Sequence, residues 1–107
     1  MATGTITKVI PTSGTGYCKM PDGTLICWGK KAVARNSGQN FTTDSFPVSF
    51  ISEPTGFCTY MTGHPEIWLA TVTDLTTTNI EMVLYNTGGT TSGNGNLYWI
   101  AIGRWKA

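Results

Sequence analysis

The last long stretch of the chain, residues 96–105, alternates as a β-strand but is apolar on both faces. One face would carry Leu97, Trp99, Ala101, Gly103 and Trp105, and the other would carry Tyr98, Ile100, Ile102 and Arg104. A strand with one face in water alternates apolar with polar residues. This stretch has no such polar face until Arg104, so we expect both of its faces to be covered.

Two further stretches also lack a polar face. Residues 67–72 and 80–85 place apolar side chains on both sides of their predicted strands. No segment repeats apolar residues at helical spacing over three turns, so the chain offers no helix as a cover. The pattern therefore favours a sheet that packs on a partner sheet and on another copy of the chain. The alternative is that Trp and Tyr side chains simply remain partly exposed.

Turn-forming residues divide the rest of the chain into short segments, which is typical of an all-β sandwich or barrel. The predicted strands are residues 4–10, 17–20, 25–33, 46–51, 56–63, 66–75, 79–88 and the terminal stretch. Residues 21–23, Pro-Asp-Gly, supply a hairpin turn, and residues 35–45 and 89–96 are predicted polar loops. The expected fold class is all-β, an antiparallel β-sandwich of about seven strands.

The composition indicates one domain, residues 1–107, with few charges. Charged residues make up 12% of the chain and the net charge is +1, whereas an average soluble domain is about 25% charged. No Lys/Arg block indicates a nucleic-acid partner, and no apolar run approaches the ~20 residues that membrane insertion takes. The chain begins without the charged and apolar segments of a signal peptide, so we expect synthesis in the cytoplasm.

The three cysteines, Cys18, Cys27 and Cys58, cannot all pair within one chain. Cys18 and Cys27 would be the candidates for a bridge across the hairpin, but buried, reduced thiols are the favoured interpretation. A zinc site takes about four closely grouped ligands, which three scattered cysteines and one histidine do not supply. We therefore expect no metal and no other cofactor.

The sequence does not favour an enzyme. Its one histidine, His64, lies in a Gly/Pro turn, which is a poor place to hold a general base. The acidic residues are dispersed, and Glu66 and Asp74 bracket one predicted strand. Their separation would exceed the 5–10 Å that two glycosidase carboxylates need. Binding is therefore a better hypothesis than catalysis.

Residues with sugar-binding chemistry lie near the predicted strand ends and loops. A sugar needs polar side chains for its hydroxyl groups and an aromatic ring for its C–H face. The candidates are His64, Glu66, Trp68, Asp74, Asn94, Arg104 and Trp105. Each also has a structural interpretation: Trp68 as a core or interface residue, Asn94 as a turn residue, and Arg104 as the partner of a carboxylate across a subunit boundary.

Several motifs together resemble a known family. They are Phe46-Pro47 followed by Pro54, the Thr-Thr-x-Asn-Ile run at residues 76–80, and Trp-Ile-Ala-Ile-Gly at residues 99–103. In this order they resemble the C-terminal receptor-binding domains of bacteriophage and prophage tail fibres, which are similar to H-type lectins. The resemblance covers residues 16–105.

The resemblance implies a trimer of H-type-lectin-like β-sandwiches at the distal tip of a virion tail fibre. The partner it implies is a bacterial surface glycan or another envelope component. Two alternatives stay open: a purely structural trimerising cap of a fibre, and a free carbohydrate-binding lectin. No ligand-contacting residue is transferred from the family, so the candidate site rests on side-chain chemistry alone.

Overall fold

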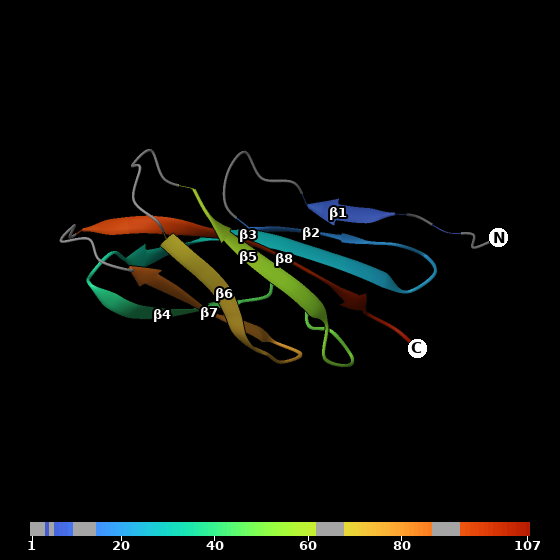
Figure 1. Cartoon of the computed structure of the whole chain (residues 1–107). Coiled ribbons are helices and arrows are strands. Elements are labelled where there is room, and N and C mark those ends of the chain that lie inside the picture. Colours follow the sequence, from blue (N-terminus) through green and yellow to red (C-terminus); the bar gives the residue numbers. More distant parts are fainter. Residues whose placement is uncertain (1–3, 5, 10–14, 62–67, 87–92) are drawn as a thin grey trace.

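The computed structural model describes residues 4, 6–9, 15–61, 68–86 and 93–107, which form two antiparallel β-sheets (Figure 1). The five-stranded sheet has the order β1 (Thr7–Val9), β2 (Gly16–Lys19), β3 (Thr24–Ala34), β8 (Asn94–Arg104) and β5 (Thr55–Tyr60). The three-stranded sheet has the order β4 (Gly38–Ser45), β7 (Asn79–Asn86) and β6 (Trp68–Leu75). The predicted all-β sandwich is therefore confirmed, with eight strands among the described residues.

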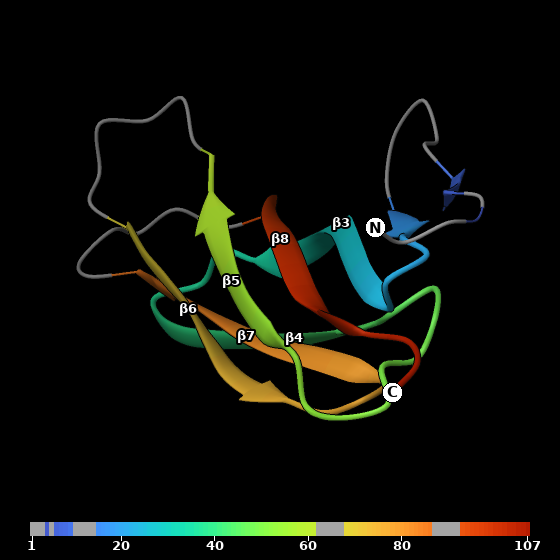
Figure 2. The same cartoon turned by 90° about the vertical axis from the view of Figure 1, so that its right-hand side faces the viewer.

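The core fills the space between the two sheets, which Figure 2 shows as layers. Its fully buried side chains come from β3, β7 and β8, and they are Leu25, Cys27, Ile80, Met82, Leu84, Leu97 and Ala101. On β8 the buried residues alternate as the sequence predicted, because successive strand residues point to opposite faces. The predicted inner face of the terminal strand is therefore confirmed.

Trp99 is the largest side chain of this core and is almost fully buried. Its register partner on β3 is Gly29, and a Cβ added at Gly29 would lie 2.5 Å from the indole ring. The ring therefore occupies the space that a side chain at residue 29 would fill. Its Nε1 donates a hydrogen bond of 3.0 Å to the Asp44 carboxylate on β4, which ties the two sheets together.

The prediction that residues 35–45 form a loop is wrong, because Gly38–Ser45 is strand β4. The strand is polar even where it faces inward, and this hid it. Asn40 is buried opposite Leu84, and its side-chain amide donates to the Leu84 carbonyl. The Asp44 carboxylate also has a partner, since it accepts the hydrogen bond from the Trp99 indole N–H. Buried polar side chains that find partners are tolerated in a sandwich core.

The prediction of a strand at residues 46–51 is also wrong, because this segment is irregular. The amides of Phe46 and Phe50 donate to the carbonyls of Thr78 and Thr77, instead of to a neighbouring strand. The two Phe rings are buried and meet edge-on at 5.0 Å. The segment is apolar because it covers one end of the core, where the ring of Phe46 also contacts Trp99 at 5.4 Å.

Other boundaries differ by a few residues. Strand β1 is shorter than the predicted strand 4–10, β5 ends at Tyr60, and β8 begins at Asn94, inside the predicted loop 89–96. Residues 62–67 and 87–92, which include parts of the predicted strands 56–63, 66–75 and 79–88, lie outside the described residues.

We expect Gly29→Ala to destabilise the domain, because the new Cβ would overlap the Trp99 ring. Overpacking of this kind costs about 1–3 kcal/mol of unfolding free energy, which denaturant unfolding would measure. Lys30→Ala is the matched control, since Lys30 is the next residue and is exposed; its effect should stay within about 0.5 kcal/mol. Equal effects of the two variants would contradict the proposed packing of Trp99 on Gly29.

Candidate functional site

The sandwich has two ends of different character. The end we call the loop end gathers the last residues of β3, β5 and β7 and the first residues of β4, β6 and β8; the register pairs Ala34 with Asn94 and Gly38 with Asn86. The opposite end, which we call the terminal end, holds the turn at residues 21–23 and the C-terminus (Figure 1). Gly4 also lies there, against Pro21.

The five predicted ligand residues that the structure describes do not gather in one place. Trp68 and Asn94 lie at the loop end, whereas Asp74, Arg104 and Trp105 lie at the terminal end. His64 and Glu66 lie outside the described residues. The sequence could not show this division, because it depends on which strands pair and in which direction.

Trp105 fixes the C-terminal segment. Its Nε1 donates to the Met20 carbonyl at 2.9 Å, and its backbone amide donates to the Gly23 carbonyl. The ammonium groups of Lys19 and Lys106 lie 4.9 and 5.0 Å from the centre of its ring. A ring that already interacts with two cations is engaged in structure.

Arg104 binds backbone oxygens at the same end. Its Nη2 donates to the Asp22 carbonyl at 2.6 Å and its Nε to the Lys106 carbonyl at 3.2 Å. The side chain of Asp22 accepts a hydrogen bond from the backbone amide of Thr24. This bond, the Thr24 hydroxyl and, to a smaller extent, the Arg104 charge lower the pKa of Asp22. These contacts hold the C-terminal segment against the turn at residues 21–23.

Trp68 belongs mainly to the core at the loop end. It is half-buried against the core, and its ring lies 5.3 Å from that of Tyr60 at a tilt of 50°. Gly95 lets the Tyr60 ring approach β8 closely, since a Cβ at residue 95 would lie 2.5 Å from the Tyr60 hydroxyl. The buried Nε1 of Trp68 has no hydrogen-bond partner among the described residues. Asn94, by contrast, is exposed.

The outer face of the five-stranded sheet carries an apolar patch. One row across this face joins Trp28, Ile100 and Phe57, and the next joins Ile26, Ile102 and Thr55. Phe57 is 63% exposed and Ile102 is 44% exposed. The predicted second apolar face of the terminal strand is thus present, and nothing within the described part of the chain covers Phe57.

The outer face of the three-stranded sheet carries a second apolar patch. Register places Leu69 beside Tyr85, and it places Thr71 and Phe41 on either side of Val83. Leu69, Tyr85 and Phe41 are exposed. Phe41 and Phe57 were not singled out from the sequence: Phe41 lay in a predicted loop, and Phe57 alternates with small or polar residues. Their position on a strand face is what gives them significance.

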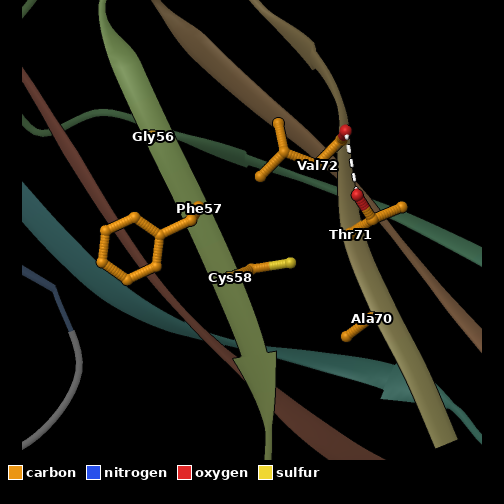
Figure 3. Close-up of a pocket in the computed structure, with 6 residues that line it drawn as sticks. All are labelled: Gly56, Phe57, Cys58, Ala70, Thr71 and Val72. Carbon is orange, nitrogen blue, oxygen red and sulfur yellow. Dashed lines mark hydrogen bonds between the residues drawn. The ribbon is translucent and has the colours of Figure 1, made fainter.

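A groove of about 260 Å³ lies between β5 and β6, where the two sheets approach each other without pairing (Figure 3). It is lined by Gly56, Phe57, Cys58, Ala70, Thr71 and Val72. In Figure 3 the Cys58 side chain points toward β6, whereas the Phe57 ring points away from it. None of the lining residues is ionised at neutral pH, because burial raises the pKa of the Cys58 thiol to about 11.

The described residues offer no assembled metal site. No group of three or more His, Cys, Asp or Glu side chains gathers among them. Within the same residues there is no helix long and apolar enough to cross a membrane. What the surface does present is two apolar faces, a groove and a set of strand ends, which is the chemistry of association and binding.

Comparison with known proteins identifies the class as a tail fibre C-terminal domain. A family model described as tail fiber protein gp53-like, C-terminal, matches residues 19–104. The chain belongs to this family, as its sequence motifs indicated. A search of curated proteins found no match.

Solved pyocin tail fibres share the fold. An N-truncated R1-type pyocin tail fibre has a TM-score of 0.75 at 19% identity, over 94% of this chain and 86% of that one. An N-truncated R2-type fibre has a TM-score of 0.74 at 19% identity, over 96% and 39%. A Pseudomonas aeruginosa R2 pyocin fibre fragment has a TM-score of 0.73 at 18% identity; the chain is covered to 94% but spans only 26% of that fragment.

All three cysteines are free thiols. Cys27 pairs in register with Tyr17, and Cys18 pairs with Ile26, so Cys18 and Cys27 lie on opposite faces of the sheet. Burial raises the pKa of Cys27 to about 11, and the Val48 carbonyl partly opposes this shift. The hairpin bridge considered from the sequence is therefore not formed.

We expect Cys27 and Cys58 to react about 100-fold more slowly with an alkylating agent at pH 8 in the native chain than in the unfolded chain. Each unit of pKa above the ordinary value near 9 lowers the thiolate fraction tenfold. Because the folded pKa is the higher one, the stabilising contribution is present below pH 9 and is lost as pH rises through 11. Mass spectrometry of alkylated peptides would measure both rates; equal rates would contradict the burial of these thiols.

Proposed function

We propose that this chain is the receptor-binding tip of a tail fibre in a virion or pyocin-like particle. The observation that carries the proposal is membership of a tail fibre C-terminal family across residues 19–104. Such particles meet a cell at the outer ends of their fibres. The proposed function therefore rests on the place of this family within a fibre as well as on side-chain chemistry.

The loop end is the favoured receptor surface. Because the family is a C-terminal one, the rest of a fibre protein would enter through β1, at the terminal end beside Pro21. The loop end then points away from the fibre. Three connections start or finish there, and loops on a rigid scaffold can vary without disturbing the core. Of the predicted residues, Asn94 and Trp68 lie at this end, and His64 and Glu66 belong to the connection from β5 to β6.

A bacterial surface glycan or another envelope component is the proposed ligand. The side-chain amide of Asn94, which is exposed at this end, can donate to and accept from the hydroxyl groups of a sugar. Hydrogen bonds to sugars compete with water, so a single site would bind in the millimolar to micromolar range. Several copies on one fibre would raise the overall affinity without new contacts.

The proposed assembly is a homotrimer. Two exposed apolar faces on a chain with 12% charged residues are unusual for a monomer. A second copy on each face would remove this apolar surface from water. The number three comes from the resemblance to tail fibre tips, and the apolar faces support association in general.

We expect the chain at micromolar concentration to have a mass about three times the 11.5 kDa of one copy. Sedimentation equilibrium or light scattering would measure it. The apolar faces supply the driving force, so the trimer should resist high salt. A species of 11.5 kDa would contradict both the trimer and the use of these faces.

We expect the variant His64→Ala/Asn94→Ala to bind host cells at least about 5-fold less than the unmodified chain. Each lost hydrogen bond costs about 1 kcal/mol, and repetition over three chains multiplies the loss. Asp74→Ala is the matched control: Asp74 is also an exposed polar residue near a strand end, but it lies at the terminal end. The measurement is adsorption of fluorescently labelled protein to a panel of bacterial strains with different surface glycans.

The outcomes separate the alternatives. Loss of adsorption with Asp74→Ala but not with the double variant would move the site to the terminal end. A folded trimer that adsorbs to no strain would favour the structural cap.

A further inference from the structure

Strands β5 and β6 are the edges of their sheets and lie beside each other along one side of the sandwich (Figure 2). β5 is hydrogen-bonded only to β8, and β6 only to β7. Monomeric proteins protect such edges with Lys or other charges. Here β5 has no charged residue, and β6 has only Asp74, close to its end. The β5–β6 edge, which we call the seam, therefore lacks the charged residues that protect a sheet edge in a monomeric protein.

Large apolar side chains flank the seam on both sides. Phe57 is 63% exposed on the outer face of the five-stranded sheet, and Leu69 is 57% exposed on the outer face of the three-stranded sheet. Met61, directly after β5, is 70% exposed. Ile102 on β8 and Tyr85 on β7 are also exposed, and they extend the apolar surface inward from each side of the seam.

The size of this surface fits a copy of the chain better than a small ligand. A stable protein interface takes about 800 Å² from each partner, and a monomer rarely exposes an apolar patch of more than a few hundred Å². An interface along this seam would combine the apolar side chains of the two flanks with the backbone edges of β5 and β6 and the groove between them.

Ring closure explains why the two flanks differ. In a cyclic trimer each copy uses two different surfaces, one for each neighbour. Two patches at the centres of opposite faces would build an open filament, whereas two patches that flank one edge close around an axis. The two patches extend across their faces, and Phe57 on β5 and Leu69 on β6 are the members that stand at the shared β5–β6 edge. Contacts made through these two residues are the kind that close a ring.

We propose that the β5–β6 edge faces the three-fold axis and that Phe57 of one copy packs on the outer face of β6 in the next copy. This proposal rests on the trimer of the proposed function and assigns its interface. Phe57 and Thr71 line the same groove, so they lie at the same level along the seam. Rotation about an axis along the seam preserves that level. Phe57 therefore meets the neighbour at Thr71, next to Leu69.

The test is oxidative cross-linking of the full chain carrying Phe57→Cys and Thr71→Cys together. Both positions are exposed, so the substitutions do not disturb the core. Within one copy the two side chains point away from each other (Figure 3), so they cannot join. Between copies they would join around the ring, and non-reducing electrophoresis should show a covalent trimer as the main species.

The single variants and the unmodified chain are the controls. A head-to-tail interface predicts that Phe57→Cys alone and Thr71→Cys alone give no more cross-linked product than the unmodified chain. Dimers from either single variant would indicate a two-fold contact and overturn the proposal. If the unmodified chain sediments as a trimer but the double variant does not cross-link, the assigned interface is wrong while the trimer stands. A monomeric unmodified chain overturns both.

Discussion

The hydrogen bond from the Trp99 indole to Asp44 is the contact on which the sandwich depends. It joins the centre of the five-stranded sheet to the three-stranded sheet at 3.0 Å. The bond requires Trp99 to lie flat over Gly29, and it requires β4 to carry an inward-facing carboxylate. A buried indole N–H without an acceptor costs about 1–3 kcal/mol. One polar pair therefore fixes the relative position of two sheets that are otherwise held by apolar contacts without direction.

The same pair explains what sequence patterns could and could not predict. β3, β7 and β8 were recognisable because their inward residues are apolar and alternate. β4 was missed because Asn40, Thr42 and Asp44 face inward, and a polar inner face has the sequence pattern of a loop. The Phe46–Phe50 segment was mistaken for a strand because it is short and apolar. Its two rings are buried because they cover the end of the core, and not because they lie on one face of a sheet. The first error comes from equating polarity with exposure, which fails wherever a buried polar group finds a partner; the second comes from equating a short apolar run with a strand.

The candidate site was predictable only in its chemistry. Its residue types suit sugar recognition, but strand pairing sends Asn94 to one end of the sandwich and Asp74 to the other. Arg104 and Trp105 are already occupied, by carbonyl oxygens and by two ammonium groups respectively. The contacts of Arg104 with Asp22 and of Trp105 with Met20 come from a turn more than eighty residues away in the sequence, and no local pattern contains them. The exposed Phe41 and Phe57 were missed for the opposite reason, since one isolated ring in a polar context carries no signal until its strand face is known.

In the proposed fibre tip, the two tasks of association and recognition would fall on different surfaces. Association would use surface that stays constant, on the strand faces and edges, where Phe57 and Leu69 are held by regular backbone pairing. Recognition would use surface that can change, at the loop end, where Asn94 is exposed and contributes nothing to the core. The terminal end is held by Trp105, Arg104 and the turn at residues 21–23. This division would let the recognition residues vary without weakening the assembly that presents them.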